Sequence, residues 1–206
     1  ESGFSVVDWT TASSTNQRAG HGLSATPEII IHKQRDNTSN WFVFTTVIDS
    51  SYDYLILNAP SAKSDASSSD LPTSTTFSTQ NFSSNWISYC FHSVEGFSSF
   101  GSYVGTGANT NTIVTGFEPA FIMVKQTTAA RNWYIMDNKR NPENPKNNLL
   151  IPNSSASEFS GSGDVYINFL ENGFEITSSA GDAINQSGQS YIYMAFAADP
   201  TAVEPS

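Results

Sequence analysis

The sequence contains a single cysteine, Cys90, and no apolar run that approaches the roughly 20 residues of a membrane-spanning helix. An intrachain disulfide is therefore excluded, and the position of Cys90 inside the apolar segment 86–91 predicts a buried thiol rather than a reactive one. No secretory signal peptide is recognisable, and the opening residue, Glu1, indicates a processed form or a piece of a longer protein. We expect stability to come from packing or oligomerisation, without insertion into a membrane.

Charged residues are also scarce, at 14% of the chain, and they are unbalanced. Nine Lys and Arg residues against nineteen Asp and Glu residues give a formal net charge of -10 at pH 7. This charge opposes binding to phosphate backbones and to anionic membranes, so nucleic acid is not an expected partner.

The hydrophobic share is low, at 38%, yet aromatic residues make up 13%, which is too many for a disordered chain. A chain of this length buries roughly 70% of its unfolded surface, enough for a sizeable core. Large aromatic side chains among many Ser, Thr and Asn residues favour an all-β protein with long polar loops.

The most informative feature of the sequence is an internal repeat. Five identical residues share one offset of 92 positions: Pro27, Lys33, Gln34, Asn40 and Trp41 coincide with Pro119, Lys125, Gln126, Asn132 and Trp133. A shared offset over five identities is hard to obtain by chance, so it predicts two copies of one structural unit.

The similarity extends beyond this stretch, with offsets that drift as the loops change length. Residues 3–6 align with 101–104 at an offset of 98, Gly22-Leu23 with Gly116-Phe117, 55–58 with 149–153, and 86–91 with 191–196 at an offset of 105. The predicted domains are a first β repeat over residues 3–95 and a second over 101–198, packed as one unit, followed by a linker or tail over 199–206.

Strand-like segments occur throughout both copies. Runs of β-branched and aromatic residues begin at Ile29 and Phe121, and further runs begin at Trp41 and Trp133 after polar loops, so each copy contains a predicted antiparallel hairpin. The dipeptide Asn172-Gly173 predicts another hairpin turn. The predicted fold is all-β, a jelly-roll-like β-sandwich built from two duplicated halves with pseudo-twofold symmetry.

Patterns typical of catalysis and metal binding are missing. The three histidines, His21, His32 and His92, are far apart, and neither a zinc signature nor a Gly-x-Ser-x-Gly sequence occurs. We expect His21 in a turn and His32 on an exposed or partner-facing side of its strand. No pair of carboxylates indicates a glycosidase, and no calcium-loop sequence is present. We predict no enzymatic activity, no cofactor, and no catalytic, cofactor-binding or metal-binding residues.

Candidate contact residues lie in one of the two equivalent hairpin loops. The loops 34–40 and 126–132 share their flanks but differ inside, and the first carries two opposite charges, Arg35 and Asp36. We hypothesise that these two residues lie at a subunit or receptor contact, the alternative being a surface ion pair. The polar tract Pro60–Thr76 is the next candidate. Four glycosylation sequons, at Asn37, Asn81, Asn153 and Asn185, are expected from composition alone and do not establish a glycoprotein.

Several motifs occur in an order that resembles a known family. They are Gly20-His21-Gly22-Leu23, Pro27 to Lys33, Asn40 to Phe44, Gly101 to Gly105, Asn132 to Ile135 and Tyr191 to Ala197. Over nearly the whole chain this order resembles a duplicated, uncharacterised domain of tail-fibre-like and virion structural proteins of marine bacteriophages. The chain departs from that pattern at Asp8–Thr11, where relatives have a glycine-containing turn. The family brings no catalytic residues with it.

The resemblance implies a non-enzymatic virion structural module of a tail fibre, spike or capsid-attached fibre, located on the virion surface or otherwise extracellular. The implied partners are other virion subunits, in a homo-oligomer for which a trimer is one option, and a host-surface glycan or protein. Scaffold-only and host-contacting versions both stay open.

The alternative function is a secreted carbohydrate-binding β-sandwich module. It is motivated by the four tryptophans and eight tyrosines of the chain. Exposed, coplanar aromatic side chains in a groove would favour this alternative, whereas aromatics buried in both halves would favour a scaffold.

Overall fold

The computed structural model describes residues 2–11, 17–66, 69–79, 84–160, 165–177 and 183–198. Within these residues the chain is all-β, and no helix is present. The predicted all-β class is thereby confirmed, and the arrangement in several antiparallel sheets is consistent with a β-sandwich. The jelly-roll-like topology and the pseudo-twofold axis stay predictions.

The first half of the chain forms a six-stranded sheet, called here the N-terminal sheet. Its strands, in spatial order, are β1 (Phe4–Thr11), β8 (Ser84–Phe91), β3 (Ile29–Gln34), β4 (Trp41–Thr45), β5 (Asp53–Ile56) and β6 (Ser64–Asp65). A separate pair, β2 (Gln17–Gly20) with β7 (Thr76–Thr79), lies beside it.

The second half forms a four-stranded sheet, called here the C-terminal sheet, with two smaller sheets. The C-terminal sheet contains, in spatial order, β12 (Trp133–Asp137), β11 (Pro119–Gln126), β17 (Ser190–Ala197) and β9 (Ser98–Val104). The smaller sheets are β10 (Asn111–Val114), β16 (Gly173–Ile176) and β15 (Ile167–Leu170), and the pair β13 (Asn148–Leu149) with β14 (Phe159–Ser160). The predicted turn at Asn172-Gly173 joins β15 to β16, so that hairpin is confirmed.

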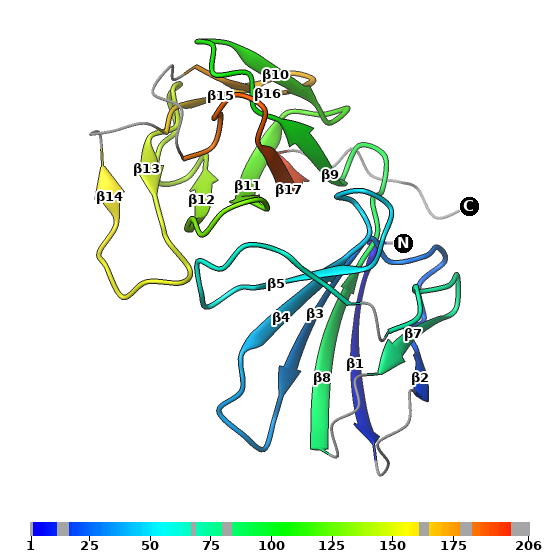
Figure 1. Cartoon of the computed structure of the whole chain (residues 1–206). Helices are drawn as coiled ribbons and strands as arrows, with labels where there is room; N and C mark the ends of the chain where they lie inside the picture. The colour runs from blue at the N-terminus through cyan, green and yellow to red at the C-terminus, as the bar shows by residue number, and fades with distance from the viewer. Residues whose placement is uncertain are drawn as a thin grey trace.

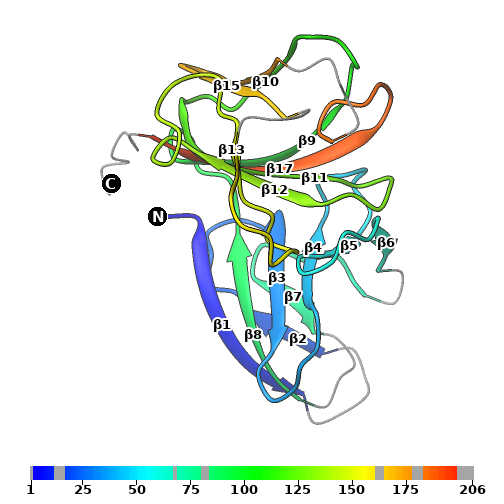
Figure 2. The ribbon, with the colours of Figure 1, turned by 90° about the vertical axis from the view of Figure 1, so that its left-hand side faces the viewer.

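The two main sheets pack on each other through their inner faces. Alternate side chains of both sheets form one shared core: Ile29, Ile31, Val43, Leu55, Phe100, Met123, Trp133, Ile192 and Met194. Figure 1 places the first half below the second, and in Figure 2 β1, β8 and β3 run up the page while β11, β12 and β17 run across it. The main strands of the two sheets therefore cross.

The outer face of each main sheet is covered by the small sheet of its own half. On the N-terminal sheet, the β2–β7 pair contributes Phe77 to a core that contains Trp9, Ile30, Phe44, Trp86 and Cys90. On the C-terminal sheet, the three-stranded sheet contributes Ile113, Ile167, Phe174 and Ile176 to a core with Ile122, Val124 and Tyr191. Both main sheets are thus covered on two faces over part of their area.

The strand pairing is the same in the two halves. Ile29 pairs with Phe91 in the first half, and Phe121 pairs with Phe196 in the second. These two pairs are related by the offsets of 92 and 105 that the sequence alignment indicates. Lys33 likewise pairs with Trp41, and Lys125 with Trp133.

The first strand of each half needs a different alignment from the one inferred from sequence. Phe4 pairs with Phe91, whereas Ser98 pairs with Phe196. Phe4 therefore corresponds to Ser98, at an offset of 94, and the sequence alignment at 98 was wrong. A shift of four residues preserves the alternation of side chains between the two faces, so the hydrophobic pattern could not distinguish these registers.

In both halves an asparagine side chain binds the start of the second hairpin strand, an arrangement called here the asparagine clasp. The Asn58 side chain accepts a hydrogen bond from the backbone N–H of Trp41 (2.9 Å) and donates one to Asn40 (3.1 Å). The Asn153 side chain makes the same pair of bonds, with the Trp133 backbone (2.9 Å) and with Asn132 (2.8 Å). The match between 55–58 and 149–153 therefore has a structural counterpart.

A glycine occupies the left-handed region at the corresponding turn of both halves. Gly22 has φ +69° and Gly116 has φ +91°, values that L side chains rarely adopt. Each glycine precedes an apolar side chain that packs into its own half, Leu23 in the first and Phe117 in the second.

Regular structure resumes at Ser98, where β9 begins, and Val94 bridges Ser98. This point lies inside the short segment between the predicted repeats 3–95 and 101–198. The predicted linker or tail, 199–206, lies outside the described residues.

The paired tryptophans provide a test of the shared core. Trp133 is 1% exposed and its indole donates a hydrogen bond to the Ile56 carbonyl (2.9 Å), whereas Trp41 is only partly buried. Trp133→Ala is expected to lower the free energy of unfolding by about 3–5 kcal/mol, and Trp41→Ala by less than about half of that, because less area is lost from the core. Urea unfolding of both variants measures the difference; equal losses would contradict the assignment.

Candidate functional site

Arg35 and Asp36 lie in the β3–β4 loop and are bound to their own sheet. Arg35 pairs with Asp8 of β1, at 2.6 Å between Nη1 and Oδ2, with 53% and 61% of the two side chains exposed. The Asp36 carboxylate accepts hydrogen bonds from the backbone and side chain of Asn85 (3.1 and 3.2 Å). The Asn85 backbone N–H is the main reason why the pKa of Asp36 is lowered. The two residues are neighbours, but each is paired with a different strand.

The corresponding loop of the second half is covered. Thr127, which corresponds to Arg35, is fully buried and its carbonyl accepts a hydrogen bond from the Lys63 backbone N–H (2.8 Å). Lys63 belongs to the polar tract Pro60–Thr76, so part of this tract bridges the halves. The Lys63 ammonium also binds Asp49 (2.8 Å) and the buried Asp53 (2.9 Å). This segment of the tract has a structural role.

The tract also borders a hollow of about 390 Å³, lined by Ser51, Tyr52, Asp65, Ala66, Ser69 and Leu71. The Tyr52 hydroxyl is buried and makes no hydrogen bond to any residue that the structure describes. Burial raises the pKa of Tyr52 above its usual range.

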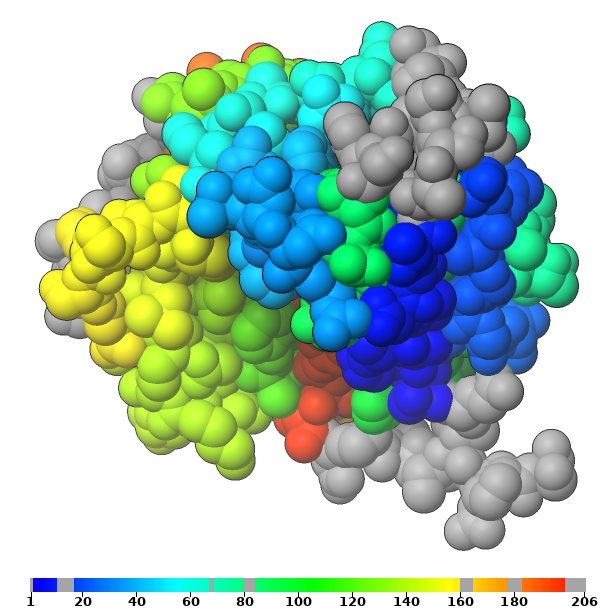
Figure 3. All heavy atoms as spheres, turned by 90° about the horizontal axis from the view of Figure 1, so that it is seen from below, coloured from blue at the N-terminus to red at the C-terminus, as the bar shows by residue number. Residues whose placement is uncertain are grey.

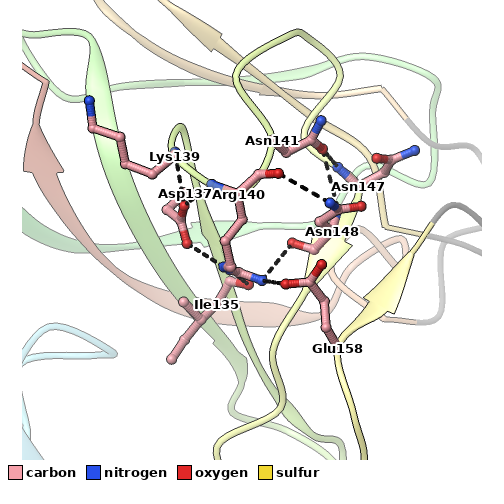
Figure 4. Close-up of polar contacts among 8 residues, drawn as sticks. All are labelled: Ile135, Asp137, Lys139, Arg140, Asn141, Asn147, Asn148 and Glu158. Atoms are coloured by element: carbon pink, nitrogen blue, oxygen red, sulfur yellow. Dashed lines mark hydrogen bonds and ion pairs between the residues drawn. The ribbon is translucent and has the colours of Figure 1, made fainter.

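Arg140 organises the long β12–β13 connection of the second half (Figure 4). Its guanidinium binds Asp137 (2.6 Å), Glu158 (3.0 Å) and the Ile135 carbonyl (3.2 Å). Asn141 holds the return of the loop by accepting a hydrogen bond from the Asn147 backbone (2.7 Å). Arg140 thus ties the connection to β12 through Asp137 and Ile135 and to the segment before β14 through Glu158, so this cluster shapes the connection.

Two of the four sequons carry asparagines with structural roles. Asn153 forms the clasp described above, and Asn185 is fully buried, where its side chain binds Asn111 (2.9 Å) and the Ala108 carbonyl (2.8 Å). Asn37 is exposed, and Asn81 lies outside the described residues.

His32 is fully buried, so its expected position on an exposed or partner-facing side was wrong. Its strand, β3, lies in the middle of a sheet that is covered on both faces. Nδ1 lies 2.6 Å from the Ser88 hydroxyl, which also accepts a hydrogen bond from the Trp9 indole (2.6 Å). Nε2 makes no hydrogen bond to a described residue, and the ring packs against Trp9, Phe44 and Phe77. Burial lowers the pKa of His32 to about 3.

The remaining histidines and the cysteine are also enclosed. His21 lies in a turn, as expected, and its ring binds the Thr73 carbonyl (3.1 Å) and the Leu23 backbone N–H (3.1 Å). His92 is 8% exposed and contacts the Ser93 carbonyl (2.9 Å). Cys90 is fully buried, as predicted, and burial raises its pKa to about 12. Among the described residues, no group of three or more His, Cys, Asp or Glu side chains could hold a metal ion.

Three partly exposed aromatic side chains, Phe4, Tyr89 and Trp41, lie on the inner face of the N-terminal sheet. The Tyr89 ring is nearly parallel to that of Phe4 (6.5 Å between centroids, 8° between planes) and to that of Trp41 (6.3 Å, 24°). Phe4 is 42% exposed, and Tyr89 and Trp41 are partly exposed. We call these three residues the aromatic platform. The sequence analysis placed Trp41 in a strand but gave no signal that it would stand in line with Phe4 and Tyr89.

Within the described residues the chain is an all-β module in which the Lys63 and Arg140 clusters organise loops. The chain belongs to the family of a domain of unknown function, DUF7483, whose model matches residues 1–200. No curated protein matches the chain, and no solved structure matches it. No helix among the described residues is long and apolar enough to cross a membrane.

Burial of His32 predicts a loss of stability in acid. The pKa of His32 is about 3 in the folded chain, whereas an ordinary histidine, as in the unfolded chain, has a pKa of 6.5. Between these two pH values the imidazole is therefore protonated in the unfolded chain and neutral in the folded chain. Stability should therefore fall by up to about 1.4 kcal/mol per pH unit as the pH drops below 6.5. His32→Phe removes this term, so the difference between variant and unmutated stability should narrow by that slope between pH 6.5 and pH 4. The free energy of unfolding is measured by urea titration at several pH values. A difference between the two chains that does not change with pH over this range would contradict the assignment.

The Arg35 and Asp36 hypothesis has a direct test. Replacing both by alanine should leave the unfolding midpoint nearly unchanged, because both are exposed, while assembly and adsorption to host cells should fall if they make the contact. The control is Lys139→Ala with Glu143→Ala, which removes two exposed opposite charges from the other half. Assembly and adsorption at the unmutated level would move the contact elsewhere, first to the outer part of the tract Pro60–Thr76.

Proposed function

We propose that this chain is a non-enzymatic structural module of a larger extracellular assembly. The observation that carries the proposal is the character of its outermost strands. Strands β1, β9 and β10 each form the edge of a sheet, and among the described residues no further strand pairs with the outer side of β1 or β10. The outer side of β9 is bridged to Val94 at Ser98 and is otherwise without a strand partner among these residues. The same strands carry exposed apolar side chains: Phe4 and Val6 on β1, Val104 on β9 and Val114 on β10.

These edges lack the features that usually prevent pairing with another chain. Strands β9 and β10 contain no charged residue, and β1 contains one, Asp8, without lysine or proline. The β1–β8 register runs without a bulge from Phe4 to Thr11. A regular edge with exposed apolar side chains is a template for strand pairing, which supports assembly into an oligomer.

The kind of assembly is proposed from the sequence resemblance. A tail fibre, spike or capsid-attached fibre on a virion surface fits a module whose described histidines, cysteine and arginine clusters all serve packing or loop structure. The partners would be other virion subunits in a homo-oligomer, a trimer being one option, and a host-surface molecule. The matching pairing, clasps and turn glycines support an origin of the two halves by duplication.

A second candidate, a secreted carbohydrate-binding module, is favoured by the aromatic platform. Three of the four tryptophans are nevertheless core residues, since Trp9, Trp86 and Trp133 are 8%, 1% and 1% exposed. The balance of the aromatic side chains therefore supports the scaffold.

Assembly through the edge strands is tested by placing a charge on them. The unmutated chain should form a concentration-dependent oligomer in analytical ultracentrifugation, and at least one of Val6→Lys, Val104→Lys and Val114→Lys should dissociate it. Unfolding should change by no more than about 0.5 kcal/mol, since these positions are exposed. Ala156→Lys, at an exposed position between β13 and β14, is the control for added charge. A monomer at all concentrations would refute the proposal.

A further inference from the structure

We infer that the aromatic platform of Phe4, Tyr89 and Trp41 is a binding site for a neutral glycan. This inference deepens the host-surface part of the proposed function and names the class of ligand. The site lies on the inner face of the N-terminal sheet, next to the part of that face that the C-terminal sheet covers. Its floor combines flat apolar rings with unused polar groups.

The three rings are only partly covered: Phe4 is 42% exposed, and Tyr89 and Trp41 pack against the shared core with part of their surface exposed. Phe4, Tyr89 and Trp41 come from three strands, β1, β8 and β4, and their planes differ by only 8° and 24° along the row. Near-parallel pairs also occur in the core, as in Trp9 with Trp86 and Tyr103 with Tyr191 at 8° each, but those rings are buried whereas Phe4 is 42% exposed. A row of near-parallel, partly exposed rings suits the flat apolar face of a sugar ring.

Polar groups at the rim of the platform have hydrogen-bonding capacity to spare. The Trp41 indole N–H and the Tyr89 hydroxyl make no hydrogen bond to any residue that the structure describes, whereas the Trp9 and Trp133 indoles are bound to Ser88 and Ile56. Asp8, at the same face, pairs with Arg35 through one carboxylate oxygen, so its other oxygen remains open to a hydroxyl group. A few placed polar groups around an apolar floor are typical of small-molecule sites.

The negative net charge of the chain disfavours anionic ligands among those that could stack on these rings. The Asp8–Arg35 pair contributes no net charge to the site, and the whole chain carries -10. Uronic acid chains and single-stranded nucleic acids also offer flat faces, but this charge repels them. Neutral glycans have the same stacking faces and hydroxyl groups without that cost.

The second half shows that the platform is not a consequence of the fold. By strand pairing, its positions correspond to Ser98, Met194 and Trp133, and the Asp8 position corresponds to Ser102. Two of the three aromatics are absent there, and Trp133 is buried under Ile56 of the first half. The platform exists only where the N-terminal sheet extends beyond its partner, and Figure 3 shows the surface hollowed between the β3–β4 hairpin and strands of the other sheet.

Binding is tested with neutral gluco-, manno- and xylo-hexasaccharides and with matched hexauronic acids, by calorimetry on the isolated chain. At least one neutral hexasaccharide should bind and change the tryptophan fluorescence. Tyr89→Ala, at a platform position outside the edge strand β1, should weaken binding at least about tenfold. Trp41→Phe should abolish the fluorescence change and weaken binding only a few-fold, because it keeps a ring but removes the indole. Phe159→Ala removes an exposed aromatic side chain from β14 and should leave binding unchanged.

Four results would overturn the inference: no neutral hexasaccharide binds, the uronic acids bind equally well, Phe159→Ala weakens binding as much as the platform variants, or the platform variants dissociate the oligomer. The last result would make the platform a contact between copies. Edge-strand assembly is measured separately with the lysine variants. A chain that assembles but binds no glycan refutes only this inference, and a monomer that binds glycan refutes only the proposed function.

Discussion

The packing of the N-terminal sheet against the C-terminal sheet is the interaction on which the rest of the structure depends. Nine buried apolar side chains from both sheets form one core, so neither half can separate without exposing it to water. The hydrophobic effect makes this cost proportional to the apolar area exposed. Two polar contacts lock the crossing, the Trp133 indole on the Ile56 carbonyl and the Lys63 backbone on Thr127.

The crossing of the two sheets makes equivalent residues unequal. Lys125 is fully buried and burial lowers its pKa to about 8, whereas its counterpart Lys33 remains partly exposed. Both lysines nevertheless donate to equivalent carbonyls of their own hairpin loop, Lys33 to Asn37 (3.2 Å) and Lys125 to Ala129 (3.4 Å). The hydrogen bond from the lysine to the hairpin loop is present in both halves, and only the burial of the lysine differs. Trp41 and Trp133 are related in the same way, and this inequality leaves the aromatic platform open.

The polar residues that most often indicate chemistry are used here for structure. His32 is neutral inside an aromatic cage, Arg140 holds a loop, and Lys63 neutralises the buried carboxylate of Asp53. Buried polar groups need partners because unpaired ones lose the hydrogen bonds of water. Among the described residues, strand edges and the partly exposed rings of the aromatic platform are left in contact with solvent.

The sequence by itself determined the all-β class, the hairpins at Trp41 and Trp133, the hairpin at Asn172-Gly173, and the buried Cys90. Each follows from local patterns, namely side-chain alternation, turn residues and identities at a shared offset. It also related β3 and β8 to β11 and β17 correctly, but it misaligned β1 with β9, because two registers four residues apart place the same faces inward.

Only the tertiary structure decided which of the equivalent residues in the two halves are exposed to solvent. His32 was misplaced because burial on both faces of β3 depends on the β2–β7 pair and the second half, which lie far away in the chain. Arg35 and Asp36 were recognised as exposed charges, yet their partners Asp8 and Asn85 come from distant strands. The alignment of Phe4, Tyr89 and Trp41 arises in the same way, because three strands separated in sequence become neighbours only when the sheet forms.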